Sequence, residues 1–154
     1  ESRKDRSEEE AKRQRPIDIE NTSARVRDLS NKWGLQWSNE TIQKWAKDIV
    51  ENNASAEDLL EELKDQAQIL FPWKNRETDT TTAASPWMET YRRVYETSAS
   101  VTDSEIQKAL VAGQSPWEFE QELKASDKWL TTKNGQDSLM GMTAEMGRKM
   151  GFNI

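Results

Sequence analysis

Helix-start signals recur at short intervals along this chain and limit it to a succession of short helices. A Ser, Thr or Asn before a first turn that contains an acid or a Pro is typical of a helix N-terminus, because its side-chain oxygen accepts an otherwise unpaired backbone N–H. Such signals stand at Thr22 or Ser23, Ser38 or Asn39, Ser55, Ser85, Thr102 and Ser115. Gly34, Pro72 and Gly113 follow three of the predicted helices and end them.

Each predicted helix carries apolar residues along one face, and no segment shows the alternation of a strand. Ile42, Trp45, Ala46 and Ile49, for example, follow the spacing of one helical face. The predicted class is therefore all-α, with six or seven short, well-capped helices in a small bundle.

The predicted helices fall into two halves. The first covers residues 22–73 and the second covers residues 85–154, which include a C-terminal docking segment. Residues 74–84 are rich in Thr and lack periodicity, so we expect a loop there. Residues 1–21 are mostly charged or polar, which indicates a linker or a solvated helix.

The composition favours a small core. Hydrophobic residues make up 34% of the chain and charged residues 32%, yet seven residues are Trp. Large aromatic side chains are usually retained where burial stabilises them, so we expect the tryptophans to build that core.

Charge and residue types exclude several functions. The net charge is −6 with acids and bases interspersed, which disfavours nucleic-acid binding. The absence of Cys and His removes thiolates, imidazoles and the usual zinc ligands, so we expect no cofactor and no metal. No apolar run reaches the roughly 20 residues of a membrane span.

Paired carboxylates are the remaining catalytic candidates. Glu118 with Glu122, and Glu57 with Glu61, lie one helical turn apart. Acids in a first turn are explained by the helix dipole, and nothing in the sequence places these in a pocket. We therefore expect no enzyme.

The C-terminal segment is the predicted docking surface. Met and Gly alternate there, which makes an isolated helix weak and an adaptable interface favourable. The predicted partner-binding residues are Leu139, Met142, Met146, Met150, Phe152 and Ile154. The alternative is that Phe152 and Ile154 fold back onto the chain's own core.

Residues 115–134, with residues 85–91 and 103–110 upstream, resemble helical modules in large virion proteins of actinobacterial long-tailed phages. In that family an apolar-Phe-Glu pair precedes a leucine, an Asp-Pro-Arg-Trp-like turn and a Thr-x-x-Ala or Thr-x-Asn segment. The matching residues here are Phe119, Glu120, Leu123, Asp127, Trp129, Thr132 and Asn134. Ser126-Asp127-Lys128 replaces the expected Asp-Pro-Arg.

The resemblance implies a structural component of the virion, such as part of a tape-measure or tail-tip protein or an internal ejected protein. Its partners would be other virion proteins and several copies of itself, and it carries over no catalytic residue. Two alternatives remain open at this point: a small peptidoglycan-binding or glycan-cleaving domain of a phage tail protein, and a helical adaptor of the host.

Overall fold

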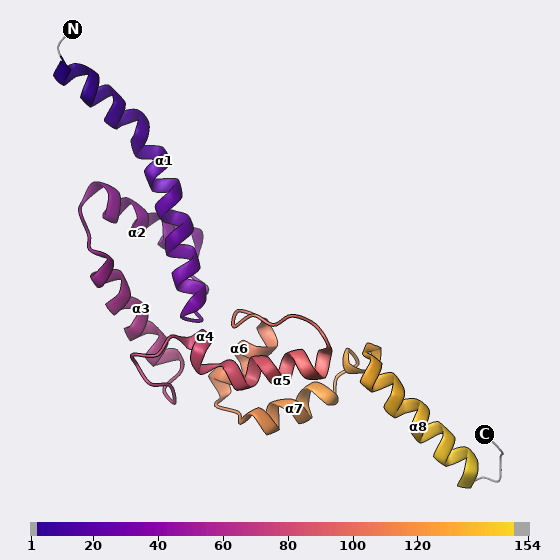
Figure 1. Cartoon of the computed structure of the whole chain (residues 1–154). Coiled ribbons are helices and arrows are strands. Elements are labelled where there is room, and N and C mark those ends of the chain that lie inside the picture. Colours follow the sequence, from indigo (N-terminus) through magenta and orange to yellow (C-terminus); the bar gives the residue numbers. More distant parts are fainter. Residues whose placement is uncertain (1–2, 150–154) are drawn as a thin grey trace. The chain divides into compact units, whose positions relative to one another are not determined.

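The computed structural model describes residues 3–149, with side chains for residues 7–146. Within this range the chain forms eight α-helices and one 3-10 turn and no strand, which confirms the all-α prediction (Figure 1). The elements are α1 (Arg3–Lys32), α2 (Asn39–Glu51), α3 (Ala56–Leu70), α4 (Thr80–Ala83), α5 (Ser85–Tyr95), α6 (Ser104–Ala112), α7 (Pro116–Lys124), η1 (Trp129–Thr131) and α8 (Lys133–Lys149). They form two compact units, Glu1–Ala83 and Ala84–Ile154.

The first helix starts far earlier than the predicted caps. α1 begins at Arg3 and continues through Pro16, so Thr22 and Ser23 lie inside it. The Ser23 hydroxyl is buried and donates to the carbonyl of Ile19 at 2.7 Å, one turn earlier, instead of capping a new helix. Residues 7–15 are mostly Glu, Lys, Arg, Gln and Ala, which are good helix formers, and this explains why the helix extends without an apolar stripe.

Three predicted N-caps are confirmed by their hydrogen bonds. Ser38 Oγ accepts from Thr41 N at 3.2 Å, Ser55 Oγ from Asp58 N at 3.0 Å, and Ser115 Oγ from Glu118 N at 3.1 Å. Each satisfies a first-turn donor that has no partner within the helix. The starts of α2, α3 and α7 are therefore encoded locally.

Two other predicted caps are wrong. Ser85 is the first residue of α5, and Ala84 occupies the N-cap position without a side-chain hydrogen bond. The predicted cap Thr102 lies one residue before the N-cap position of α6, which Asp103 occupies, and the Asp103 carboxylate accepts from the backbone N of Ser100 at 2.8 Å instead of from the helix. The carboxylate closes the preceding turn, because a short polar side chain can bond either neighbouring segment.

The core of the first unit contains buried residues of α1, α2 and α3, and α1 packs directly against α2. Its buried apolar residues are Val26, Trp33, Leu35, Ile42, Ala46, Leu59, Leu63, Ala67 and Phe71. Those on α2 and α3 recur every three or four residues, as the predicted apolar faces require.

Residues 74–84 contain a helix and form hydrogen bonds to the end of α1, whereas the sequence predicted a loop there. They include the short helix α4, whose Thr80 is fully buried and donates from Oγ1 to the carbonyl of Trp33 at 2.6 Å. Thr81 Oγ1 donates to the carbonyl of Lys32 at 2.7 Å. The segment thus supplies donors to the end of α1, which is followed by a turn at Gly34 with a φ of 73°.

Gly34→Ala is expected to destabilise the first unit strongly. A Cβ at this position would lie 2.8 Å from Thr80 Cγ2 and 3.0 Å from Phe71 Cε2, in addition to the cost of a left-handed backbone. We expect a loss of about 2–5 kcal/mol in the free energy of unfolding, the sum of strain and overpacking. Gly113→Ala is the matched control, because its φ is 69° and nothing lies within 4 Å of the added Cβ. Urea denaturation showing equal losses for both variants would contradict the close approach at Gly34.

An ion cluster joins α3 to the segment after it. Glu77 accepts from Lys64 Nζ at 2.6 Å and from Arg76 Nη1 at 3.2 Å, while Arg76 also pairs with Glu61 and Asp65. The hydrogen bond from Lys64 holds the pKa of the Glu77 carboxyl below its ordinary value. The contribution of Glu77 is therefore present above the ordinary carboxyl pKa and is lost as the pH falls through the lowered one.

Glu77→Gln is expected to lower the Tm near neutral pH, and the Tm difference from wild type should shrink as the pH falls through the lowered pKa of the Glu77 carboxyl, where the wild-type side chain becomes protonated as well. The measurement is thermal unfolding of both proteins across this pH range. Glu20→Gln is the control, since Glu20 is exposed on α1 and forms no ion pair among the described residues. A Tm difference for Glu77→Gln that stays constant with pH would refute the assignment.

Candidate functional site

The second unit is built on α5. α6 and α7 both pack against it, and its buried side chains include Tyr91, Val94 and Tyr95. The core is completed by Ala84, Val101, Ile106, Ala109, Leu110, Phe119 and Leu123. Gly113 ends α6 and Ser115 caps α7, so a short connection separates the two helices that pack on α5.

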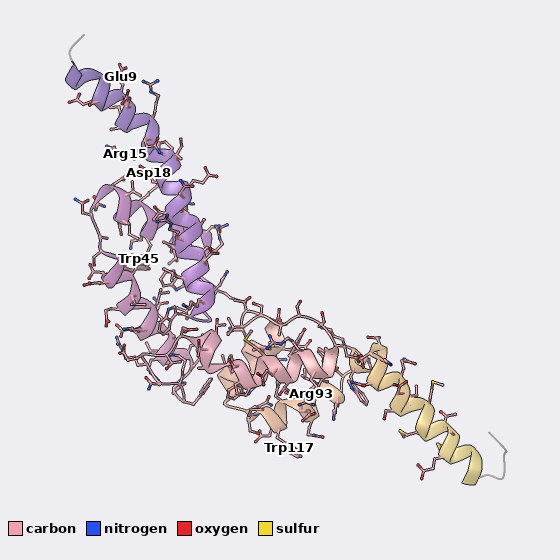
Figure 2. All side chains as sticks on the ribbon, viewed as in Figure 1. Glu9, Arg15, Asp18, Trp45, Arg93 and Trp117 are labelled. Atoms are coloured by element: carbon pink, nitrogen blue, oxygen red, sulfur yellow. The ribbon has the colours of Figure 1, made fainter. Side chains whose placement is uncertain are left out.

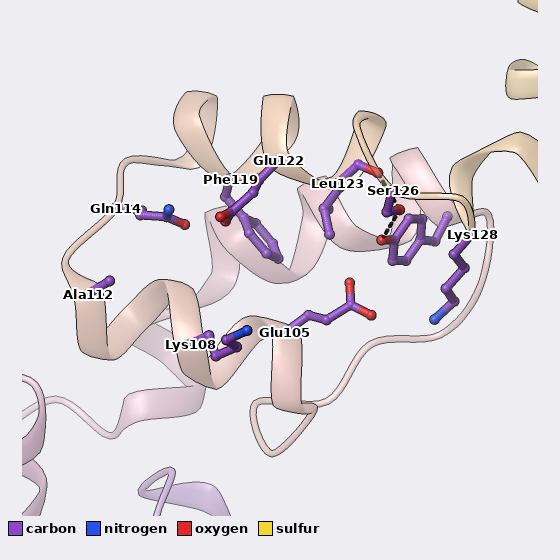
Figure 3. Close-up of a pocket in the computed structure, with 10 residues that line it drawn as sticks. Glu105, Lys108, Ala112, Gln114, Phe119, Glu122, Leu123, Ser126 and Lys128 are labelled. Atoms are coloured by element: carbon purple, nitrogen blue, oxygen red, sulfur yellow. Dashed lines mark hydrogen bonds between the residues drawn. The ribbon is translucent and has the colours of Figure 1, made fainter.

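A cavity of about 370 Å³ lies between facing sides of α6 and α7 (Figure 3). Glu105, Lys108 and Ala112 line it from α6, at the spacing of one helical face. The remaining lining residues are Tyr95, Gln114, Phe119, Glu122, Leu123, Ser126 and Lys128. Its volume is at the lower end of the roughly 300–1,000 Å³ that is usual for small-molecule sites.

One end of the cavity is a closed polar network. Lys128 Nζ donates to Tyr91 Oη at 2.9 Å and lies 4.5 Å from the centre of the Tyr95 ring. Tyr95 Oη is 2.7 Å from Ser126 Oγ, which donates to the Leu123 carbonyl. Figure 3 shows Ser126 and Lys128 together at this end. The polar groups at this end of the cavity therefore already have partners within the protein.

The surroundings of this network shift the pKa values of two of its members. Burial, reinforced by the Glu105 carboxylate, raises the pKa of the Tyr95 phenol. The hydrogen bond to Tyr91, with the negative charge of Glu105 nearby, raises the pKa of the Lys128 ammonium. Lys128 is therefore a permanent cation balanced by Glu105 and by the faces of two aromatic rings.

The other end of the cavity holds polar groups without partners. Gln114 Oε1 is buried and accepts no hydrogen bond from the described residues. Lys108 and Glu122 line the same cavity from α6 and α7 and form no ion pair among those residues. In Figure 3 the Gln114 amide points from the connection toward the cavity. A buried acceptor, a cation and an anion thus line this end of the cavity.

The predicted docking residues fall into two groups. Leu139, Met142 and Met146 lie on α8 and are 47%, 59% and 60% exposed. Their positions follow the 3 and 4 spacing of one helical face, and the main packing partner of α8 is η1. Met150, Phe152 and Ile154 lie outside the described residues.

The expected core role of tryptophan holds for part of the set. Trp33 is buried, and Trp37 stacks on Trp45 with ring centres 6.3 Å apart. Trp73 and Trp117 are exposed, and Trp117 projects from α7 with 67% of its surface accessible (Figure 2). Trp117 occupies the first turn of α7, directly after Ser115 and Pro116.

The paired carboxylates have different roles from those expected of a catalytic pair. Glu61 binds Lys64 and Arg76 in the ion cluster, and Glu57 is exposed. Of the second pair, Glu122 alone lines the cavity. No group of three or more acids that could hold a metal ion occurs among the described residues. None of the helices in the described range is both long and apolar enough to cross a bilayer.

The residues that sequence reasoning missed are Lys108, Gln114 and Lys128. Lys108 and Lys128 are ordinary surface types in a chain with 22 Lys and Arg, and Gln114 sits in a helix connection. No local signal distinguishes them, because the packing of α6 and α7 on α5 brings them together.

Comparison of the chain with models of known protein families, with curated proteins and with solved structures found no match.

Gln114→Met is expected to stabilise the unliganded protein by about 1 kcal/mol, because it removes a buried acceptor that has no partner. Gln66→Met is the matched control and should destabilise by a similar amount. The Gln66 amide accepts from Trp37 Nε1 at 2.7 Å and donates to Glu62. Chemical denaturation measures both changes. Destabilisation by Gln114→Met comparable to that of Gln66→Met would show that Gln114 is a structural residue.

Proposed function

We propose that this chain is a non-catalytic assembly protein that works by packing α8 against another protein chain. The supporting observation is the exposed line of Leu139, Met142 and Met146 on that helix. Large apolar side chains at helical spacing are the usual anchors of a helix that docks against a partner. Two of the three are methionines, whose flexible thioethers adapt to a partner surface.

The composition of α8 supports the same proposal. Gly135 is buried against the backbone of η1, but Gly141 has open space around it, where a glycine lowers helix stability without any gain in internal packing. A helix of this length is marginal in water unless another surface covers its apolar face. A partner chain that covers the face would supply the missing stabilisation.

The proposed setting is the virion of a long-tailed phage, with other virion proteins and further copies of this chain as partners. This part rests on the resemblance of residues 115–134 and the matching segments upstream. The peptidoglycan-directed alternative has one observation in its favour, because Glu105 and Glu122 line the same cavity. Two lysines share that lining and balance the charge of both acids, which suits binding better than general acid catalysis.

The test is incorporation into particles. The combined variant Leu139→Ser, Met142→Ser and Met146→Ser should keep the Tm of the isolated chain but lower its amount in gradient-purified particles about tenfold or more, since each buried Leu or Met side chain contributes roughly 1.5–3 kcal/mol. Met140→Ser is the control, because Met140 is exposed on a different face of α8. Immunoblotting against the major coat protein measures the ratio.

Absence of the wild-type chain from purified particles would contradict the virion setting. A large fall in the Tm of the isolated triple variant would show that the face belongs to the chain's own core. Release of reducing ends from peptidoglycan by the wild-type chain would favour the enzymatic alternative.

A further inference from the structure

The cavity between α6 and α7 has a chemistry that the assembly role does not use. We propose that it is a binding site for a free α-amino acid with an apolar side chain. Its requirements follow from the groups left without partners: the carboxylate of Glu122, the ammonium of Lys108 and the buried Gln114 Oε1. A ligand that satisfies all three carries an ammonium, a carboxylate and a spare N–H donor.

The charge balance excludes simpler ligands. A ligand with only a positive charge would pair with Glu122 but would be repelled by Lys108 on the opposite wall. A ligand with only a negative charge would pair with Lys108 but would be repelled by Glu122. It would also leave Gln114 Oε1 without a donor, at the cost of a buried unsatisfied acceptor. A zwitterion avoids both costs, because its ammonium can bond Glu122 and Gln114 while its carboxylate bonds Lys108.

The other two charged residues of the cavity, Lys128 and Glu105, do not change the charges that a ligand must carry. Lys128 is held by its hydrogen bond to Tyr91 and by the Tyr95 ring, and Glu105 faces both Tyr95 and Lys128. Together these two residues add no net charge. The recognition of ligand charge therefore falls to Glu122 and Lys108.

The rest of the lining suits an apolar side chain. Phe119 and Leu123 present carbon surfaces from α7, and the Tyr95 ring lines the cavity from α5. A volume of about 370 Å³ accommodates one amino acid but not a folded peptide segment. Polar amino acids would bury a second polar group among these carbons without a partner, so apolar side chains are preferred.

The first measurement is an NMR titration of the full chain with L-phenylalanine and L-leucine. We expect saturable shifts of the Gln114 side-chain amide and of the Trp87 indole N–H, which donates to the Gln114 carbonyl at 2.9 Å. The dissociation constant should be about 1 mM or tighter. The indole N–H of Trp37 in the other unit should not move.

Ligand halves test the zwitterion directly on the wild-type protein. Phenethylamine lacks the carboxylate, 3-phenylpropionate lacks the ammonium, and L-glutamate lacks the apolar side chain. Each should bind about tenfold or more weakly than L-phenylalanine, as expected for loss of one charge-assisted hydrogen bond or of the apolar contact. Equal binding of phenethylamine would make this a cation site and overturn the proposal.

Variants locate the binding. Glu122→Gln and Lys108→Met should each weaken L-phenylalanine binding about tenfold. Glu118→Gln should not, because Glu118 is exposed on the same helix and does not line the cavity. Both cavity positions are on the exposed rim, so the variants should fold, and circular dichroism checks this. No binding by the wild-type chain, or binding that neither cavity variant weakens, would refute the site and leave the assembly role of α8 untouched.

Discussion

The last carbonyl groups of α1 need hydrogen-bond donors, and the way they obtain them determines how the first unit packs. The carbonyls of Trp33 and Lys32 accept from Thr80 and Thr81, residues 47 and 49 positions later in the chain. Helix ends leave such carbonyls unpaired, and burial without donors would cost about 1–3 kcal/mol each. The chain must therefore return from α3 to the end of α1.

Several residues must pack closely where the chain returns to the end of α1. Gly34 has no Cβ, so Thr80 and Phe71 can approach the turn after α1. Lys74 is buried beside them, with its ammonium donating to the carbonyls of Asn75 and Thr78 and lying 4.9 Å from the centre of the Trp33 ring. Burial lowers the pKa of this ammonium, so the backbone acceptors and the ring compensate only part of its lost hydration. The segment between the units is thus a structural part of the first unit.

Local chemistry explains which features were predictable. The class, most of the helices and the caps at Ser38, Ser55 and Ser115 depend on neighbouring residues, and the sequence displays them directly. Ser23 and Asp103 have the same residue types but bond an earlier turn, a choice that depends on what the adjoining segment does. The contacts of residues 74–84 and the cavity of the second unit depend on pairs distant in sequence. The sequence shows Lys74 and Gln114 as polar residues, but only the packing of the chain buries Lys74 and the Oε1 atom of Gln114.

The two units differ in whether their buried polar groups have hydrogen-bond partners, and this difference supports the proposals made for the second unit. In the first unit the buried Thr80 and Lys74, and the half-buried Gln66, all bond to other parts of the same unit. In the second unit Gln114 Oε1 is buried without a partner while the apolar face of α8 stays exposed. Neither arrangement contributes to the stability of the isolated chain, and both become favourable once something binds. The two proposed surfaces differ in chemistry, because the exposed residues of α8 are uncharged and apolar, which suits another protein, and the cavity carries both charges, which suits a small zwitterion. The proposed ligand and the proposed partner would therefore not compete for the same residues.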